Sequence, residues 1–206
     1  VAELIDTKHV EARAELFVLA KRPERALDCL LDVQGTSIAP DAIQSLVADH
    51  GLFDEVARNA SRFVRAARSA ASLLFVSHVD VLPIDEMGEQ LEGEDLAWYL
   101  QLCFEHKLLD APELSRWHDM FVELHTDLSD FLRASSLYDK EKALERCMQL
   151  ERWRDAAYLL GCLNREADAI ALLLKHNDLD GAARHAASSE EALVAFSERA
   201  TARPDL

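Results

Sequence analysis

Residues 153–186 read WRDAAYLLGCLNREADAIALLLKHNDLDGAARHA, and this stretch decides the fold. Apolar side chains recur in it at i, i+3, i+4 and i+7, which is the spacing of one face of an α-helix. The pattern appears three times, and each copy places one apolar stripe on one short helix. The copies are Trp153, Ala156, Ala157 and Leu160; Ala167, Ile170, Ala171 and Leu174; and Leu179, Ala182, Ala183 and Ala186.

The apolar stripes are evenly spaced along the chain. Alanines stand thirteen residues apart at Ala143, Ala156, Ala169, Ala182 and Ala195. We therefore expect a helix and a turn in each interval, and a hairpin about every 26 residues. A short helix cannot bury its apolar face alone, whereas stacked neighbours bury a continuous core. The sequence predicts an all-α fold: an α-solenoid of stacked antiparallel helical hairpins, with about a dozen helices.

The rest of the composition agrees with short, closely connected helices. Only 6 Gly and 5 Pro occur in 206 residues, so loops are short and few. The chain begins with Val1, and we expect residues 1–206 to be a single solenoid segment of a longer chain. Leu52 to His78 contains neither Pro nor Gly. It predicts the longest helical element, either one helix of about 40 Å or two helices broken near Ser69.

A basic stripe stands out in this long segment. Arg58, Arg62, Arg65 and Arg68 follow one another at steps of four, three and three, so a continuous helix would turn them broadly one way. Such a stripe is either a solvated helix face or a docking strip for an acidic partner helix. These four arginines are the candidate partner-binding residues.

The chain is strongly acidic, with a formal net charge of −16. Between Asp80 and Asp130 there are fourteen acids and two bases, which concentrates most of the excess in a quarter of the chain. A nucleic-acid backbone and an anionic membrane surface are both repelled by such a field. We expect no nucleic-acid partner and no direct membrane insertion, since no apolar run is long enough to cross a bilayer.

Residue patterns for catalysis and metal binding are missing. Cys29, Cys103, Cys147 and Cys162 are far apart in sequence and lie in helical apolar contexts, which indicates buried thiols. His118 and His125 are seven residues apart and lack a third ligand at metal-binding spacing. Trp98, Trp117 and Trp153 have apolar neighbours that indicate core positions. We expect no enzyme activity, no metal and no cofactor.

From Leu96 onward an ordered series of motifs resembles a known family, the clathrin heavy-chain repeat region of the vacuolar protein-sorting tether subunits of the HOPS and CORVET complexes. The resemblance covers residues 94–187. The motifs are Trp98-Tyr99-Leu100, Trp117-His118-Asp119-x-x-Val122-Glu123-Leu124, Phe131-Leu132-Arg133-x-Ser135, Tyr138-Asp139-x-Glu141-Lys142-Ala143-Leu144-x-x-Cys147, and Tyr158-Leu159-Leu160-Gly161.

The resemblance implies a non-catalytic scaffold within a tethering complex that serves endosome-to-vacuole or lysosome transport and membrane fusion. It implies a cytoplasmic protein, peripheral to the late endosome or vacuole. Its partners would be other subunits of the complex, a small GTPase bound through the complex, and a second copy in self-association. Two other classes stay open: a stand-alone helical-repeat adaptor or coat or ciliary-transport scaffold, and an unrecognised helical enzyme. A deep polar pocket with converging carboxylates or histidines would favour the enzyme.

Overall fold

A computed structural model of the chain has helices as its only regular elements in the residues it describes. These are fourteen α-helices and one short 3-10 helix, so the predicted all-α class is confirmed. They form two compact units, Val1–Leu108 and Leu109–Leu206. That the units act as one continuous segment stays a prediction, and Ala195 lies outside the described residues. The described residues are 7–32, 40–187, 193–194 and 196–197.

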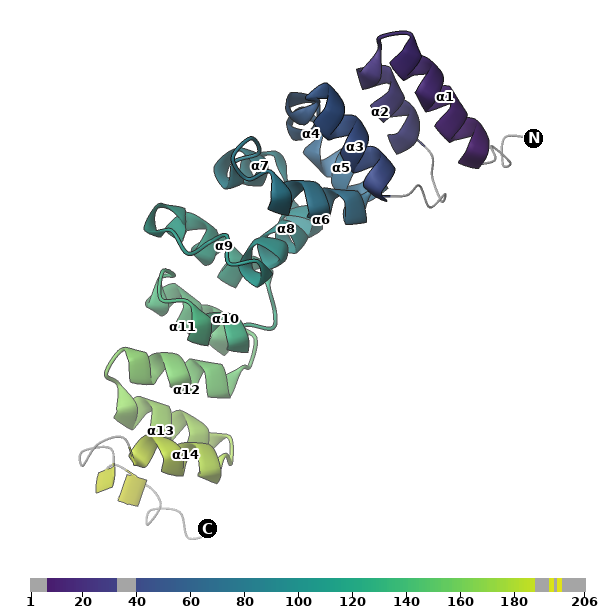
Figure 1. Cartoon of the computed structure of the whole chain (residues 1–206). Coiled ribbons are helices and arrows are strands. Elements are labelled where there is room, and N and C mark those ends of the chain that lie inside the picture. Colours follow the sequence, from purple (N-terminus) through teal and green to yellow (C-terminus); the bar gives the residue numbers. More distant parts are fainter. Residues whose placement is uncertain (1–6, 33–39, 188–192, 195, 198–206) are drawn as a thin grey trace. The chain divides into compact units, whose positions relative to one another are not determined.

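Unit 1 is built from helices of uneven length (Figure 1). Helix α1 packs on α2, α3 on α6, and α5 against α6, α7 and α8. Three buried rings form the centre, because Phe75 lies 6.3 Å from Phe63 and meets Tyr99 edge-on at 5.5 Å. The helices are α1 (Thr7–Leu19), α2 (Pro23–Leu31), α3 (Pro40–His50), α4 (Phe53–Arg58), α5 (Ala60–Ala66), α6 (Arg68–Ser77), α7 (Ile84–Gln90) and α8 (Gly93–Glu105).

The prediction that Leu52 to His78 forms the longest helical element is wrong. The segment contains three helices, α4, α5 and α6, with breaks at Asn59 and Ala67. The Asn59 side chain donates to the main-chain oxygen of Glu55 (3.0 Å), a local bond that competes with the helix ladder. The second break, at Ala67, lies near Ser69, where the alternative prediction placed a break between two helices. It lets α6 fold back on α5, so that Phe75 packs on Phe63, and this packing overrides helical propensity. Helices α1 and α8, with 13 residues each, are longer.

Unit 2 follows the predicted period closely. Its helices α11 to α14 begin at residues 140, 153, 166 and 179, thirteen apart. Each packs on the next in sequence, and the alanines at 143, 156, 169 and 182 are fully buried between them. The elements are η1 (Pro112–Leu114), α9 (Ser115–Leu124), α10 (Ser129–Ala134), α11 (Lys140–Gln149), α12 (Trp153–Cys162), α13 (Glu166–Lys175) and α14 (Leu179–Ala186).

One turn geometry connects these four helices. Glu151, Asn164 and Asn177 each adopt a left-handed conformation, with φ between 56 and 58°. The next residue donates its N–H to the carbonyl five positions earlier, at 2.8 to 2.9 Å. This is the Schellman motif, which satisfies the last carbonyls of a helix and reverses the chain. Because the turn is identical each time, the thirteen-residue period is set locally.

Candidate protein-interaction surfaces

The four arginines predicted as a docking strip lie on three consecutive helices of unit 1, so they do not share one helix face. Arg58 ends α4 and pairs with Glu55 one turn earlier, at 2.6 Å. Arg62 on α5 contacts both Asp28 and Asp32 of the α2 end, at 2.7 and 2.6 Å. Its hydrogen bond to Asp28 is the main cause that raises the pKa of Arg62 above its usual value. Arg62 thus holds α5 against α2.

The other two arginines meet a buried carboxylate. Arg65 Nε lies 2.7 Å from Asp95 Oδ2, and Arg68 Nη2 lies 3.8 Å from the other oxygen. The Asp95 side chain is only 5% exposed and occupies the third position of α8, where the helix dipole favours a negative charge. The Arg68 guanidinium also lies over the Trp98 ring, 5.2 Å from its centre. The pair therefore ties α5 and α6 to α8.

Internal pairing leaves these arginines accessible from outside. Their side chains are between 40 and 71% exposed. The guanidinium presents five N–H donors, so one edge can bind a carboxylate of the same unit while another faces solvent. The strip can accept an acidic partner, and reversing its charges would also break contacts within unit 1.

Unit 2 contains a second buried carboxylate at the equivalent helix position. Asp155 is the third residue of α12, and its side chain is 3% exposed. Ser129 Oγ donates to it at 2.8 Å, Arg133 Nη1 lies at 3.3 Å and Arg152 Nη2 at 3.1 Å. Arg152 also reaches Asp127 (2.8 Å), and this hydrogen bond lowers the pKa of the Asp127 carboxyl. The cluster anchors α10 to the start of α12.

Both buried acids escaped sequence reasoning, because acidic residues are ordinarily exposed. A local signal existed for one of them. Arg152 precedes Asp155 by three residues, and the same spacing recurs at Arg165 and Asp168 one period later. For Asp95 the arginine partners lie about 30 residues away in sequence, so no local pattern could have identified it.

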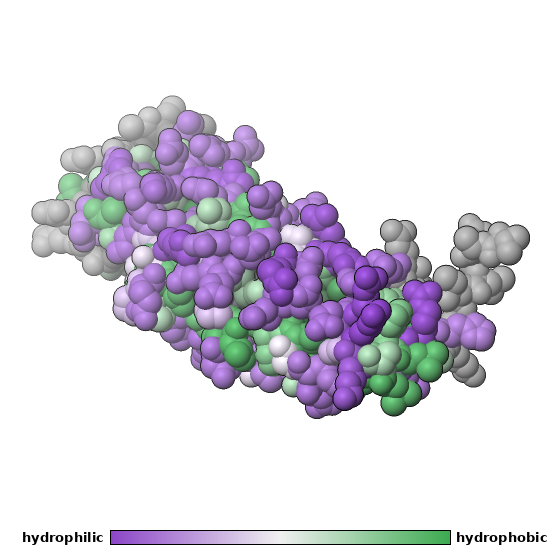
Figure 2. All heavy atoms as spheres, turned by 90° about the horizontal axis from the view of Figure 1, so that it is seen from above, coloured by the Kyte–Doolittle hydropathy of each residue, from purple (hydrophilic) through white to green (hydrophobic). Residues whose placement is uncertain are grey.

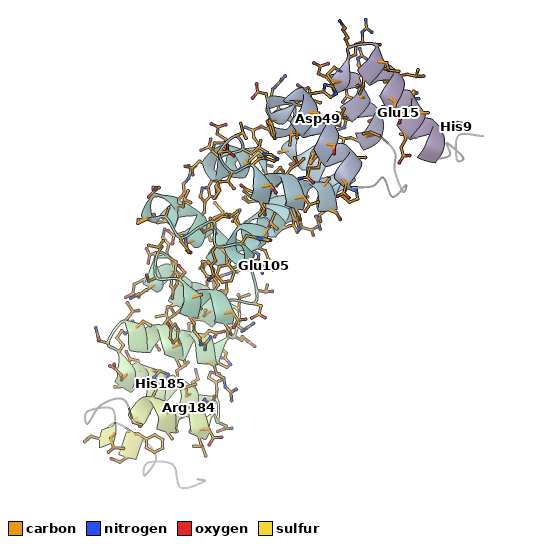
Figure 3. The ribbon with its side chains drawn as sticks, viewed as in Figure 1. His9, Glu15, Asp49, Glu105, Arg184 and His185 are labelled. Carbon is orange, nitrogen blue, oxygen red and sulfur yellow. The ribbon has the colours of Figure 1, made fainter. Side chains whose placement is uncertain are left out.

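Beside Asp155 lies a concave surface of about 360 Å³, which we name the basic groove. Three arginines line it together with a single carboxylate, in a chain whose net charge is −16. In Figure 3 two of its residues, Arg184 and His185, are labelled on α14. The lining residues are Arg133, Arg154, Tyr158, Leu173, Asp178, Gly181, Arg184 and His185.

A larger concavity of about 760 Å³ opens at the turns that precede α12 and α14. Trp153 and His176 stack across its wall, with ring centres 3.9 Å apart. Of the tryptophans expected in the core, Trp117 is buried and Trp153 and Trp98 are half-buried. Four carboxylates and two arginines line it, so acidic groups outnumber basic ones there.

Cys29, Cys103, Cys147 and His118 are buried in the helix packing, whereas Cys162, which was also expected to be buried, is half-buried. Burial raises the pKa of Cys103 to about 12 and that of Cys147 to about 11, which keeps these thiols protonated and unreactive at neutral pH. His118 Nε2 lies 2.7 Å from the Leu109 carbonyl and Nδ1 lies 2.7 Å from Ser135 Oγ. Both ring nitrogens are therefore occupied by structural hydrogen bonds.

Figure 2 shows hydrophilic side chains over most of the visible face, with apolar side chains in patches between them. Within the described ranges, no group of three or more His, Cys, Asp or Glu could hold a metal ion. None of the helices there combines the length and the apolar character needed to span a bilayer.

Comparison with known proteins gives one family. The family described as the Vps41 TPR-like region matches residues 3–192. Proteins called vacuolar protein sorting-associated protein 41 homolog are 29% identical over 177 residues in Solanum lycopersicum, 26% over 193 in Arabidopsis thaliana and 25% over 186 in Homo sapiens. These alignments cover 80, 84 and 86% of this chain and 18, 19 and 21% of the relatives. The chain thus spans about a fifth of their length, and no solved structure matches it.

Proposed function

Because the chain belongs to the Vps41 TPR-like region family, we propose that it is a non-catalytic protein-interaction scaffold, a segment of a vesicle-tethering subunit. The family match over residues 3–192 carries this proposal. It includes every helix from α1 to α14. The relatives are named for vacuolar protein sorting. We propose the same role for this chain because it belongs to the same family.

The construction of unit 2 supports a scaffold. Helices α11 to α14 each pack on their sequence neighbours through small buried residues and identical turns. Such a stack keeps its outer residues at fixed spacing and presents an extended surface to partners. The large concave surfaces carry surface ion pairs, which suits recognition of another protein.

The finer proposal concerns place and partners. The protein acts in endosome-to-vacuole or lysosome transport and membrane fusion, in the cytoplasm and peripheral to the late endosome or vacuole. Its partners are other subunits of a tethering complex, with a small GTPase bound through that complex, and residues 94–187 form a part similar to the clathrin heavy-chain repeat. A net charge of −16 supports an indirect membrane link through these partners.

The arginine strip is proposed as one contact within this role, binding an acidic helix through the outer edges of its guanidiniums. Arg58 gives the cleanest test, because its ion pair is with Glu55 in the same short helix. Arg58→Glu should weaken capture of the partner subunit with little change in thermal unfolding. Lys21→Glu, an equal charge change elsewhere in unit 1, serves as the control. Unchanged capture by the Arg58 variant would reject the strip.

The scaffold role is tested by shortening the stack in register. Deleting residues 153–178 from the gene joins Arg152 to Leu179 and puts α14 where α12 began, because the two helices start 26 residues apart. We expect a folded protein that no longer retrieves its partner subunits in affinity purification and blocks delivery to the vacuole or lysosome. Deleting residues 153–172 breaks the period and is the control for misfolding. An in-register deletion that leaves both the complex and the transport intact would reject the role.

A further inference from the structure

The charges of the basic groove are not balanced by its own carboxylate. Asp178 caps α14 by accepting from the Gly181 N–H (3.0 Å) and pairs with Arg154 Nε at 2.5 Å. The pair with Arg154 is the first cause that lowers the pKa of Asp178. Asp178 is therefore ionised and pairs with Arg154, while Arg184 acts on it only through a weaker charge interaction without an ion pair.

The two remaining arginines, Arg133 and Arg184, differ in whether a carboxylate pairs with them. Arg133 shares Asp155 with Arg152, and its guanidinium lies 5.1 Å from the centre of the Tyr158 ring. Arg184 Nε donates to the main-chain oxygen of Asp180 (3.2 Å). In the described part of the chain Arg184 has no carboxylate within ion-pair distance. Its guanidinium is an exposed positive charge at the wall of a concave surface.

Two glycines inside helices shape this groove. A Cβ on Gly161, in α12, would come within 3.3 Å of the His185 ring, and a Cβ on Gly181, in α14, within 2.8 Å of the Asp178 carboxylate. Both glycines occur on helices that line the groove, where they let His185 and Asp178 come close to the backbone.

The floor of the groove is partly apolar. The buried Leu173 and the half-buried Tyr158 ring lie between the arginines. Burial lowers the pKa of His185, so this imidazole is neutral at pH 7 and contributes hydrogen bonding rather than charge. A matching ligand has carboxylates spaced around an apolar side chain.

We propose that the basic groove binds a short acidic segment of a protein partner, with a carboxylate on Arg184 and an apolar side chain on Tyr158. This inference rests on the proposed scaffold function only in requiring a protein partner. The groove is a concavity of about 360 Å³, which suits side chains better than a flat bilayer surface. The field of an acidic chain also repels lipid headgroups and nucleic acid, whereas a single short segment meets mainly the local positive charge.

The test measures binding of a fluorescein-labelled peptide, Glu-Leu-Glu-Glu-Leu-Glu, to the full chain by fluorescence polarisation. We expect binding that weakens as salt is raised, and no binding of the peptide with Gln in place of Glu. Arg184→Glu should weaken binding at least about tenfold, a loss of about 1.4 kcal/mol. Arg184→Gln should have a smaller effect in the same direction, and it covers the case in which the charge reversal disturbs the fold.

Lys175→Glu is the matched control, because it makes the same charge change on α13 outside the groove lining. It should bind the peptide within twofold of the unmodified chain. The proposal is overturned if both Arg184 variants bind like the unmodified chain, if the Gln peptide binds equally, or if no peptide binds. Arg184-dependent sedimentation with phosphatidylserine vesicles in place of peptide binding would overturn it in favour of a membrane site. A failed peptide-binding test would reject only the basic groove as a binding site. The scaffold role is tested independently by the deletion of residues 153–178, so the two proposals can fail separately.

Discussion

Asp95 in unit 1 and Asp155 in unit 2 occupy the same position in their helices and differ in what surrounds them. Asp95 is held by arginines that come from two other helices, α5 and α6. Asp155 receives one arginine, Arg152, from the turn just before its own helix, besides Ser129 and Arg133 of α10. In unit 1 the ionic contact joins short helices that follow no period, whereas in unit 2 it adds to a stack already set by its turns.

This difference indicates two ways of fixing a helical array. Identical turns and buried alanines recur in α11 to α14, so the structure of each hairpin is determined by residues within that hairpin. Unit 1 has helices of 6 to 13 residues, and its long-range contacts from Arg62 and Arg65 connect residues 30 to 34 positions apart. Order there depends more on tertiary contacts than on any local signal.

The largest expected effect comes from placing a carboxylate in the alanine core without the partners that Asp155 has. Ala182 is fully buried on α14, whereas its neighbour Ala183, which the sequence pattern placed on the same apolar stripe, is exposed. Ala182→Asp should cost about 4 kcal/mol or more, because the buried charge has no arginine or hydroxyl partner. Ala183→Asp, the same change one residue on, should cost less than about 1 kcal/mol. Urea unfolding of both variants checks this, and similar losses would place the stripe elsewhere.

The comparison itself is tested by removing charge from the two buried acids. Asp155→Asn should cost about 2 to 3 kcal/mol, because hydrogen bonds from Ser129 and two arginines are lost or weakened. Asp95→Asn should cost about 1 to 2 kcal/mol, since its second arginine is at 3.8 Å and both arginines remain exposed.

Asp168→Asn provides the control for that pair, because Asp168 is also the third residue of its helix and pairs with an arginine three residues earlier, yet it is exposed. Its loss should be within about 0.5 kcal/mol. Equal losses at Asp95 and Asp155 would mean that the local arginine of unit 2 adds nothing, and the contrast between the units would fail.

The sequence predicted those parts of the structure whose causes are local. The thirteen-residue period followed from apolar spacing, and it is confirmed because each turn uses residues within its own interval. The break at Asn59 escaped prediction, because its cause is a single side-chain bond to the Glu55 carbonyl. The break at Ala67 lies close to the predicted alternative at Ser69, and ring packing between α5 and α6 stabilises it. Spacing located the four arginines predicted as a docking strip. The carboxylates that pair with Arg62, Arg65 and Arg68 lie in distant segments that no local pattern connects to them, whereas Arg58 pairs locally with Glu55.

Turn strain gives the next smaller effect and appears in both units. Gly51 ends α3 of unit 1 with φ +64° and has open space around the position of a Cβ, so Gly51→Ala should cost about 1 kcal/mol through the backbone alone. Glu151, in the same conformation, should gain about 0.5 to 1 kcal/mol when changed to Gly. Asn164→Gly should change stability by only a few tenths, about 0.3 kcal/mol, because asparagine tolerates this conformation. Thermal unfolding of the three variants would contradict the shared turn if Glu151→Gly destabilised the chain.

The smallest expected effect is the pH dependence that His185 of unit 2 contributes. His185 lies partly buried beside Gly161, and burial, which is the first cause, lowers its pKa; Arg184 acts in the same direction and Glu166 against it. A histidine with a lowered pKa in the folded state takes up its proton more readily when unfolded. Its contribution to stability is therefore present above pH of about 6.5, the unfolded value, and is lost as the pH falls toward and through the folded pKa.

His185→Asn removes that titration. The difference in unfolding free energy between the unmodified chain and this variant should shrink steadily as the pH falls from 7.5 toward 5.5 (about one unit on either side of the unfolded pKa). A difference that stayed flat over this range would mean that the His185 ring is well solvated in the folded chain, and the close approach that Gly161 permits would then have no energetic consequence. A difference that widened at low pH would mean that a favourable charge interaction, with Glu166 the nearest candidate, outweighs burial at this end of the basic groove.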